Sequence, residues 1–75
     1  MTLNELRPGQ IAKIIDINII GALKRRIIDM GIIPGTKLIV KRIAPFGDPM
    51  QINVRGYELS LRKNEAQKIE IVKGE

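Results

Sequence analysis

The hydroxyl side chains are the first candidates for chemistry, and none of them has the partner that a nucleophile needs. Besides Tyr57, the hydroxyl groups are those of Thr2, Thr36 and Ser60. The chain contains no histidine that could serve as their general base, and a serine or threonine hydroxyl is a weak nucleophile without one. Ser60 also stands between two leucines in an alternating run, as the outward residue of a strand does. We therefore predict no catalytic residue and no enzymatic activity.

The acidic side chains do not form a metal-binding pattern either. Asp16, Asp29, Asp48 and Glu58 are scattered, without the loop spacing of an EF-hand. The absence of cysteine and histidine removes thiolate and imidazole ligands. Asp48 precedes a proline and is expected to cap a turn. We predict no metal site and no bound cofactor in this chain.

The most informative segment is the basic run at residues 21–35, which reads GALKRRIIDMGIIPG. Leu23, Ile27 and Met30 recur at the spacing of one helix face. Gly31 follows where a left-handed C-cap is needed, and the Pro-Gly pair at 34–35 suits a type II turn. The segment therefore predicts a helix over residues 22–30 that is closed by a turn.

The opposite face of this helix is basic, with one apolar residue on it. Lys24, Arg25 and Ile28 lie roughly opposite the apolar stripe. Asp29, near the end of the helix, is expected to pair with Arg25 or Arg26, which precede it by one turn.

Further apolar residues fall where burial is not expected. Ile39 lies off the inward register of its strand, and Phe46 lies in a turn-rich connection. A basic rim around apolar residues is typical of a protein-docking surface. The predicted partner-binding residues are Lys24, Arg25, Ile28, Ile39, Phe46 and Tyr57.

The bulk composition limits the class of protein. A chain of 75 residues makes one domain, residues 1–75. Its net charge of +5 favours an anionic partner without specifying which one. Two aromatic residues are too few for the stacking platforms of single-strand recognition, so we expect no nucleic acid as partner. No apolar run could span a bilayer and no signal peptide is visible, so we expect a cytoplasmic protein, peripheral at the inner face of the membrane at most.

Short alternating runs predict the remaining elements. Strands are expected at residues 10–17, 36–43, 50–54, 57–62 and 69–71, with one helical turn at 63–66 and another opened by a capping box at Thr2 and Glu5. The adjacent Ile14 and Ile15 predict a bulge in the first strand. Five short strands joined by tight turns favour a closed antiparallel barrel, because closure removes exposed edges. We predict a mostly β (small α+β) chain: an SH3-like five-stranded antiparallel barrel, with one short helix between the first and second strands and a single helical turn before the last.

Four sequence motifs occur in a family-like order and spacing. They are LRPG at residues 6–9, RRIIDMGIIPGT at 25–36, APFGDP at 44–49 and RGYELSLRKNEA at 55–66. Through them the chain resembles the ferrous iron transport protein A (FeoA) family along essentially its whole length. The one departure is Phe46, where the family more often has leucine.

The resemblance implies a small cytosolic SH3-like domain of a bacterial ferrous iron uptake system. Its implied partner is the membrane permease of that system, which carries a cytoplasmic GTPase domain. The implied role is regulatory binding, with ferrous iron as the transported ion and not a cofactor of this chain. Related domains occur in metal-dependent repressors, so a nucleic-acid-binding or metal-sensor-type SH3-like module is the alternative. The sequence leaves open a homo-oligomer, and whether the domain stimulates GTP hydrolysis, gates transport or assembles the complex.

Overall fold

A single curved antiparallel sheet forms the body of the molecule. The computed structural model describes residues 1–74, and its five strands follow the order β4-β3-β2-β1-β5. The strands are β1 (Ile11–Ile17), β2 (Lys37–Ile43), β3 (Met50–Val54), β4 (Tyr57–Leu61) and β5 (Ile69–Lys73). Three short helical segments complete the chain: η1 (Leu3–Glu5), α1 (Ala22–Asp29) and α2 (Lys63–Ala66). The predicted mostly β architecture is confirmed.

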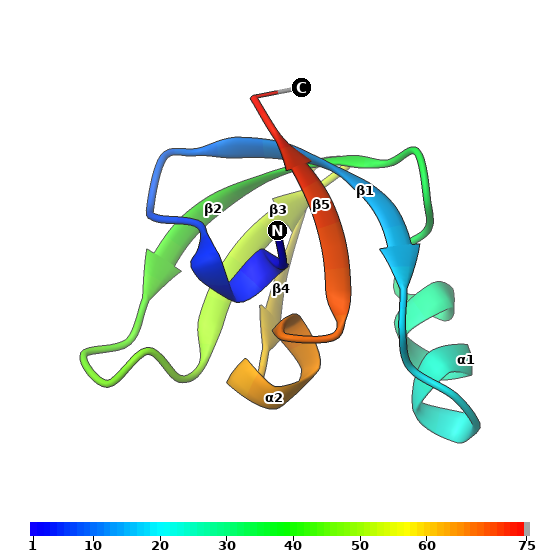
Figure 1. Ribbon diagram of the computed structural model, residues 1–75. Helices are drawn as coiled ribbons and strands as arrows, with labels where there is room; N and C mark the ends of the chain where they lie inside the picture. The colour runs from blue at the N-terminus through cyan, green and yellow to red at the C-terminus, as the bar shows by residue number, and fades with distance from the viewer. Residues whose placement is uncertain (75) are drawn as a thin grey trace.

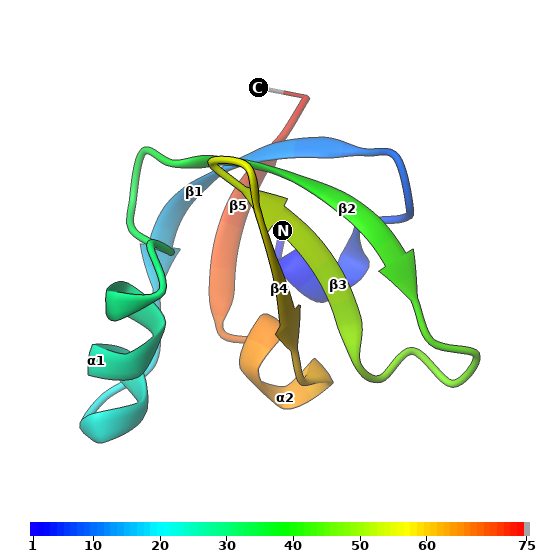
Figure 2. The same cartoon turned by 180° about the vertical axis from the view of Figure 1, so that it is seen from behind.

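The helices occupy different places around the sheet. α1 stands at one side of the barrel, and the loop between β2 and β3 projects from the opposite side (Figures 1 and 2). α2 lies beneath the barrel, between the ends of β4 and β5 (Figure 1). The two longer helices, α1 and α2, therefore lie against different parts of the sheet.

Alternating aliphatic side chains fill the interior of the barrel. β3 shows the pattern most clearly, because Met50, Ile52 and Val54 are buried while the residues between them are half-buried. In β1 the register against β5 shifts between Ile14 and Asp16, which confirms the predicted bulge. The bulge lets Ile14 and Ile17, which are three positions apart, both stay buried, while Ile15 and Asp16 between them face outward.

Element boundaries differ from the predicted ones by a few residues, for local reasons. The second strand begins after Thr36. The Thr36 N–H donates to the Ile33 carbonyl at 3.1 Å, so Thr36 belongs to the turn before the strand. The last strand runs on to Lys73, because Val72 and Lys73 continue the pairing with β1. Within that preceding turn Gly35 has φ +93°, as a type II turn requires.

The turn between β3 and β4 is a two-residue hairpin. Arg55 has φ 53° and Gly56 has φ 87°. Positive φ at both central residues is the geometry of the type I′ turn, whose twist matches that of antiparallel strands. The hairpin places Arg55 at the end of the sheet that faces the loop between α1 and β2.

Asp48 has a role that differs from the predicted one. Its carboxylate does not cap a turn of its own loop. It accepts the backbone N–H of Lys63, at the start of α2, at 3.1 Å. Only the fold could bring these two residues together, because 15 positions separate them.

Candidate docking surface

Three side chains on one face hold α1 against the core. Ile27 is fully buried, and Leu23 and Met30 are partly buried and pack against the core cluster. The predicted inward face is therefore confirmed. Because these anchors recur along one side only, the other side of the helix faces solvent.

Backbone hydrogen bonds close the end of the helix. The Gly31 N–H donates to the Ile28 carbonyl at 2.9 Å, and the Ile32 N–H donates to the Ile27 carbonyl at 3.2 Å. This pair of bonds, with Gly31 at φ +93°, is a Schellman motif. Ile32 is itself fully buried. The end of α1 is thereby fixed at the position that the sequence predicts.

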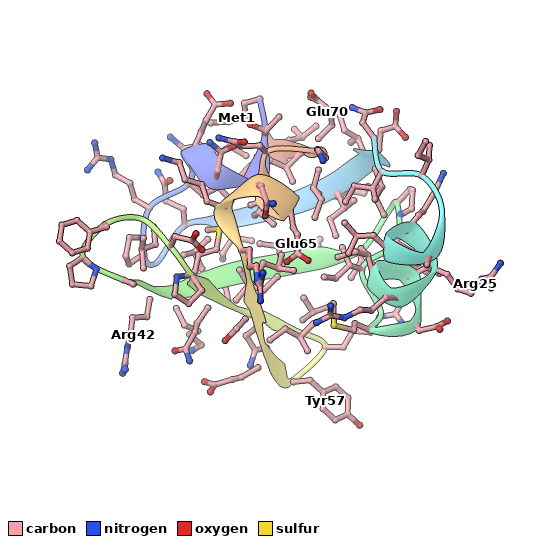
Figure 3. The ribbon with its side chains drawn as sticks, turned by 90° about the horizontal axis from the view of Figure 1, so that it is seen from below. Met1, Arg25, Arg42, Tyr57, Glu65 and Glu70 are labelled. Atoms are coloured by element: carbon pink, nitrogen blue, oxygen red, sulfur yellow. The ribbon has the colours of Figure 1, made fainter. Side chains whose placement is uncertain are left out.

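The outward face of α1 carries three of the predicted binding residues together. Lys24, Arg25 and Ile28 are exposed and, with Gly21, line a shallow hollow of about 270 Å³. Ile28 keeps 40% of its surface exposed. Figure 3 shows Arg25 extending from the helix away from the body of the protein. An apolar side chain between two cations is therefore present as predicted, and its role in binding stays a prediction.

Ile20, at the start of this segment, is a further exposed apolar residue and is absent from the predicted set. It precedes Gly21 and is 89% exposed, whereas its neighbour Ile19 is 4% exposed. The signal in the sequence was the pair of adjacent isoleucines in a short loop, because only one of them can point inward. We call the set Ile20, Lys24, Arg25 and Ile28 the α1 surface.

The other three predicted binding residues do not join the α1 surface. Phe46 is 93% exposed, but its loop projects from the side of the barrel opposite α1 (Figure 2). Tyr57 is 74% exposed at the start of β4, away from Arg25 in Figure 3. Ile39 is half-buried and lines a different hollow on the sheet. The six predicted residues therefore do not share one face, and their part in partner binding stays a prediction.

Few of the charges on the described part of the chain are paired. Across residues 1–74 the one ion pair joins the N-terminal ammonium to Glu70, at 3.5 Å. The predicted pairing of Asp29 with Arg25 or Arg26 is wrong. All three side chains are exposed, and exposed pairs gain little over hydration. Among the described residues, the cations of the α1 surface therefore have no internal counter-ion.

The described residues also lack a cluster of metal ligands and a membrane-spanning helix. Between Met1 and Gly74, no three acidic, histidine or cysteine side chains gather as a metal site would need. No helix in that range has the length and apolar character required to cross a bilayer.

Comparison with known proteins places the whole fold in one family. The sequence model of the FeoA domain matches residues 1–73. The chain is 37% identical over 71 residues to the Fe(2+) transport protein A/Fe(2+) transporter FeoB fusion protein of Porphyromonas gingivalis. That alignment covers 95% of this chain and 8% of the fusion protein, so the chain spans a small part of that relative.

Solved structures agree on the fold. The FeoA protein of Chlorobium tepidum superposes with a TM-score of 0.89 at 41% identity, covering 95% of this chain and 68% of that one. FeoA of Stenotrophomonas maltophilia, a prokaryotic SH3 domain protein solved in complex with zinc, superposes with a TM-score of 0.84 at 25% identity, covering 96% of this chain and 89% of that one. The predicted SH3-like fold is confirmed. With its family match over nearly every residue, the chain belongs to the FeoA domain family.

Proposed function

We propose that this chain is a non-enzymatic, cytoplasmic regulatory protein of a ferrous iron uptake system. In this proposal it docks on the cytoplasmic, GTP-binding part of an FeoB-type transporter and modulates it. The carrying observation is the Porphyromonas gingivalis relative, in which transport protein A and transporter FeoB form one polypeptide. Fusion keeps two domains at a high effective concentration, which benefits parts that act together. A docking surface on the FeoA domain brings about the same proximity, and this is the role that we propose for this chain.

The α1 surface supports such docking by its chemistry. Ile20 and Ile28 offer exposed apolar area. Lys24 and Arg25 line the same hollow as Ile28, and within residues 1–74 neither forms an ion pair. Interfaces commonly combine an apolar centre with a charged rim. Unpaired cations also speed the approach to an acidic partner, and this effect weakens with salt.

A binding experiment with a double variant tests the proposal. The purified chain is mixed with its cognate FeoB transporter in detergent, and retention is measured from low to physiological salt. Arg25→Glu with Ile28→Asp should abolish retention, because it reverses a charge and places another in the apolar centre. Lys73→Glu with Val72→Asp is the matched control, since it makes the same charge change at exposed positions that pair with the start of β1, whereas α1 follows the end of β1. Retention of a well-folded α1 variant at the wild-type level would place docking elsewhere.

The same experiment separates the alternative functions. Duplex and single-stranded DNA are added as competitors. A nucleic-acid-binding module would release the transporter and bind the DNA, and its affinity for DNA would fall steeply with rising salt. Thermal unfolding with added ferrous iron or zinc tests a metal sensor, because a ligand that binds the folded state raises the Tm. DNA capture without transporter retention would contradict the regulatory proposal.

A further inference from the structure

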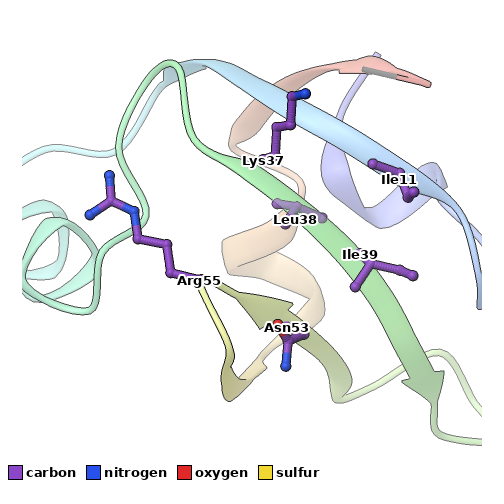
Figure 4. A pocket seen from close by; sticks show the side chains of 6 residues that line it. All are labelled: Ile11, Lys37, Leu38, Ile39, Asn53 and Arg55. Carbon is purple, nitrogen blue, oxygen red and sulfur yellow. The ribbon is translucent and has the colours of Figure 1, made fainter.

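The outer face of β1, β2 and β3 carries a second hollow, separate from the α1 surface. Its volume is about 260 Å³. It is lined by Ile11, Lys37, Leu38, Ile39, Asn53 and Arg55. In Figure 4 Lys37 and Arg55 lie toward the end nearer α1, and the Arg55 side chain extends beyond the sheet toward the loop before β2. We call this set the sheet hollow.

Three cations gather at one end of the sheet hollow. Lys13 and Lys37 are direct partners across β1 and β2. Leu38 pairs with Val54, so Arg55, the first residue of the turn after β3, lies at the same end of the sheet as Lys37. All three cations are exposed, and in residues 1–74 none of them forms an ion pair with a carboxylate. Like charges directly opposite each other destabilise a sheet. Here no paired carboxylate among the described residues offsets that repulsion, so the three side chains form a positively charged cluster.

The other end of the sheet hollow is apolar. Ile11 and Ile39 are partners across β1 and β2, and Ile11 keeps 48% of its surface exposed. Each isoleucine lies two residues along its strand from a lysine of the cationic cluster, Lys13 or Lys37. At about 3.4 Å per residue, the apolar and cationic ends are therefore roughly 7 Å apart.

We propose that the sheet hollow binds an extended acidic segment of a protein partner. An aliphatic side chain of that segment rests on Ile11 and Ile39, and a carboxylate two residues away pairs with Lys37 and Arg55. The spacing supports this occupant, because side chains at i and i+2 of an extended chain point the same way and lie about 7 Å apart. Glu58, the partner of Asn53 on β4, adds negative charge beyond the apolar end. Because Asn53 is in turn the partner of Ile39, Glu58 favours the orientation in which the carboxylate of the segment lies at the cationic end of the hollow.

The combination of features favours a peptide over other anions. A free phosphate would use the cations and leave Ile11 and Ile39 uncovered. Single-stranded nucleic acid stacks on aromatic side chains, and the six lining residues include none. This site does not depend on the proposed docking through α1, because the two sets share no residue.

The probe is a fluorescein-labelled synthetic peptide of alternating leucine and aspartate separated by serine, added to the full chain. Fluorescence anisotropy measures affinity, and amide NMR spectra locate the contact. We expect shifts at Lys13, Lys37, Ile39 and Arg55. Lys37→Glu with Arg55→Asp should weaken binding about tenfold or more, equivalent to about 1.4 kcal/mol. Aspartate is chosen at position 55 because it tolerates positive φ, and Glu at position 37 gains Lys13 as partner.

A matched control separates site binding from general charge attraction. Lys63→Glu with Lys68→Glu makes the same change in net charge at exposed positions on and after α2, and it should bind the peptide as the wild type does. A peptide with asparagine in place of aspartate should bind as weakly as the sheet-hollow variant. Equal losses in both double variants, or none in either, would overturn the proposal. Phosphatidylglycerol vesicles are the last arm, and capture of vesicles without peptide binding would also overturn it.

Discussion

α1 and α2 are both short helices that are stabilised differently. Apolar side chains along one face hold α1 against the core, whereas carboxylates that accept backbone N–H groups at the start of α2 stabilise that helix. In α2 the Glu65 carboxylate accepts the Arg62 N–H at 2.9 Å, and Asp48 accepts the Lys63 N–H at 3.1 Å. Ala66 is fully buried and Glu65 is 9% exposed. A helix of four residues has little stability of its own, so α2 persists because its backbone donors are satisfied and its apolar side is covered.

α1 is stabilised by different interactions. It spans eight residues and has no side-chain cap at its first turn. The buried Ile27 and the Schellman motif at Gly31 fix it. Its outward residues Lys24, Arg25 and Ile28 are exposed, so we expect them to contribute little to the stability of the fold. The comparison indicates that α2 serves the fold and that the outer face of α1 is available for binding.

The largest expected effect tests the anchoring of α1. Ile27→Ala should lower the free energy of unfolding by about 3 kcal/mol, because it leaves a cavity beneath the helix. Ile28→Ala, one position on, should change it by less than about 0.5 kcal/mol. Urea unfolding of both variants measures the difference. Similar losses at the two positions would mean that the outer face of α1 also supports the fold.

The next effect concerns the end of α1. Gly31→Ala should lower the free energy of unfolding by about 1–2 kcal/mol, because an L side chain is strained at a φ of +93°. Gly31→Asn should lose less, since asparagine tolerates the left-handed region. Thermal unfolding compares the two. If alanine is tolerated as well as asparagine, the Schellman motif does not govern how α1 ends.

A smaller effect compares carboxylates at the two helices. Asp48→Ala should lower the free energy of unfolding by about 1 kcal/mol, as the loss of a cap to α2 does. Asp29→Ala should be neutral or slightly stabilising, because an unpaired carboxylate at the end of α1 opposes the helix dipole. Urea unfolding distinguishes them, and equal losses would contradict the different anchoring of the two helices.

The smallest expected effect is a pH dependence of the stability, which arises at η1. As in α2, a carboxylate accepts a backbone N–H at the start of this helical turn. The Glu5 carboxylate accepts the Thr2 backbone N–H at 2.7 Å and the Thr2 hydroxyl at 3.0 Å. These bonds, the backbone one first, lower the pKa of Glu5 below its ordinary 4.5. The added stability is therefore full above pH 4.5 and is lost as pH falls through the lower pKa of the folded state.

Glu5→Gln is the variant that measures this term. It should be less stable than the wild type at neutral pH, and the difference should shrink as the solution is acidified below the ordinary glutamate pKa. Thermal unfolding across that range follows both proteins. A difference that stays constant with pH would show that the capping box acts through its shape and not through its charge.

Most of the fold followed from local signals. The alternation in β3, the adjacent Ile14 and Ile15, and Gly31 after an apolar stripe each act within a few residues, so the sequence predicts a strand, a bulge and a helix end. Asp48 did not behave as its neighbours suggest. Its partner, the Lys63 N–H, comes from a distant part of the chain, and no local pattern reveals such a contact.

The candidate surfaces were less predictable than the elements that carry them. Helical spacing alone grouped Lys24, Arg25 and Ile28, because one helix face is a local property. Phe46 has the exposure that its loop predicts, yet the path of β2 carries it to the side opposite α1. Exposure can be predicted from a single segment, whereas adjacency depends on how segments are placed.

The sequence by itself determined the element order, the inward faces, the turns and the absence of histidine and cysteine chemistry. Only the tertiary structure decided which exposed side chains become neighbours. Strand register brought Lys13 against Lys37 and Ile11 against Ile39, and the positions of α1 and the β2–β3 loop separated residues that the sequence analysis had joined. The physical reason is that local periodicity fixes the direction of a side chain, while pairing between distant segments fixes what it meets.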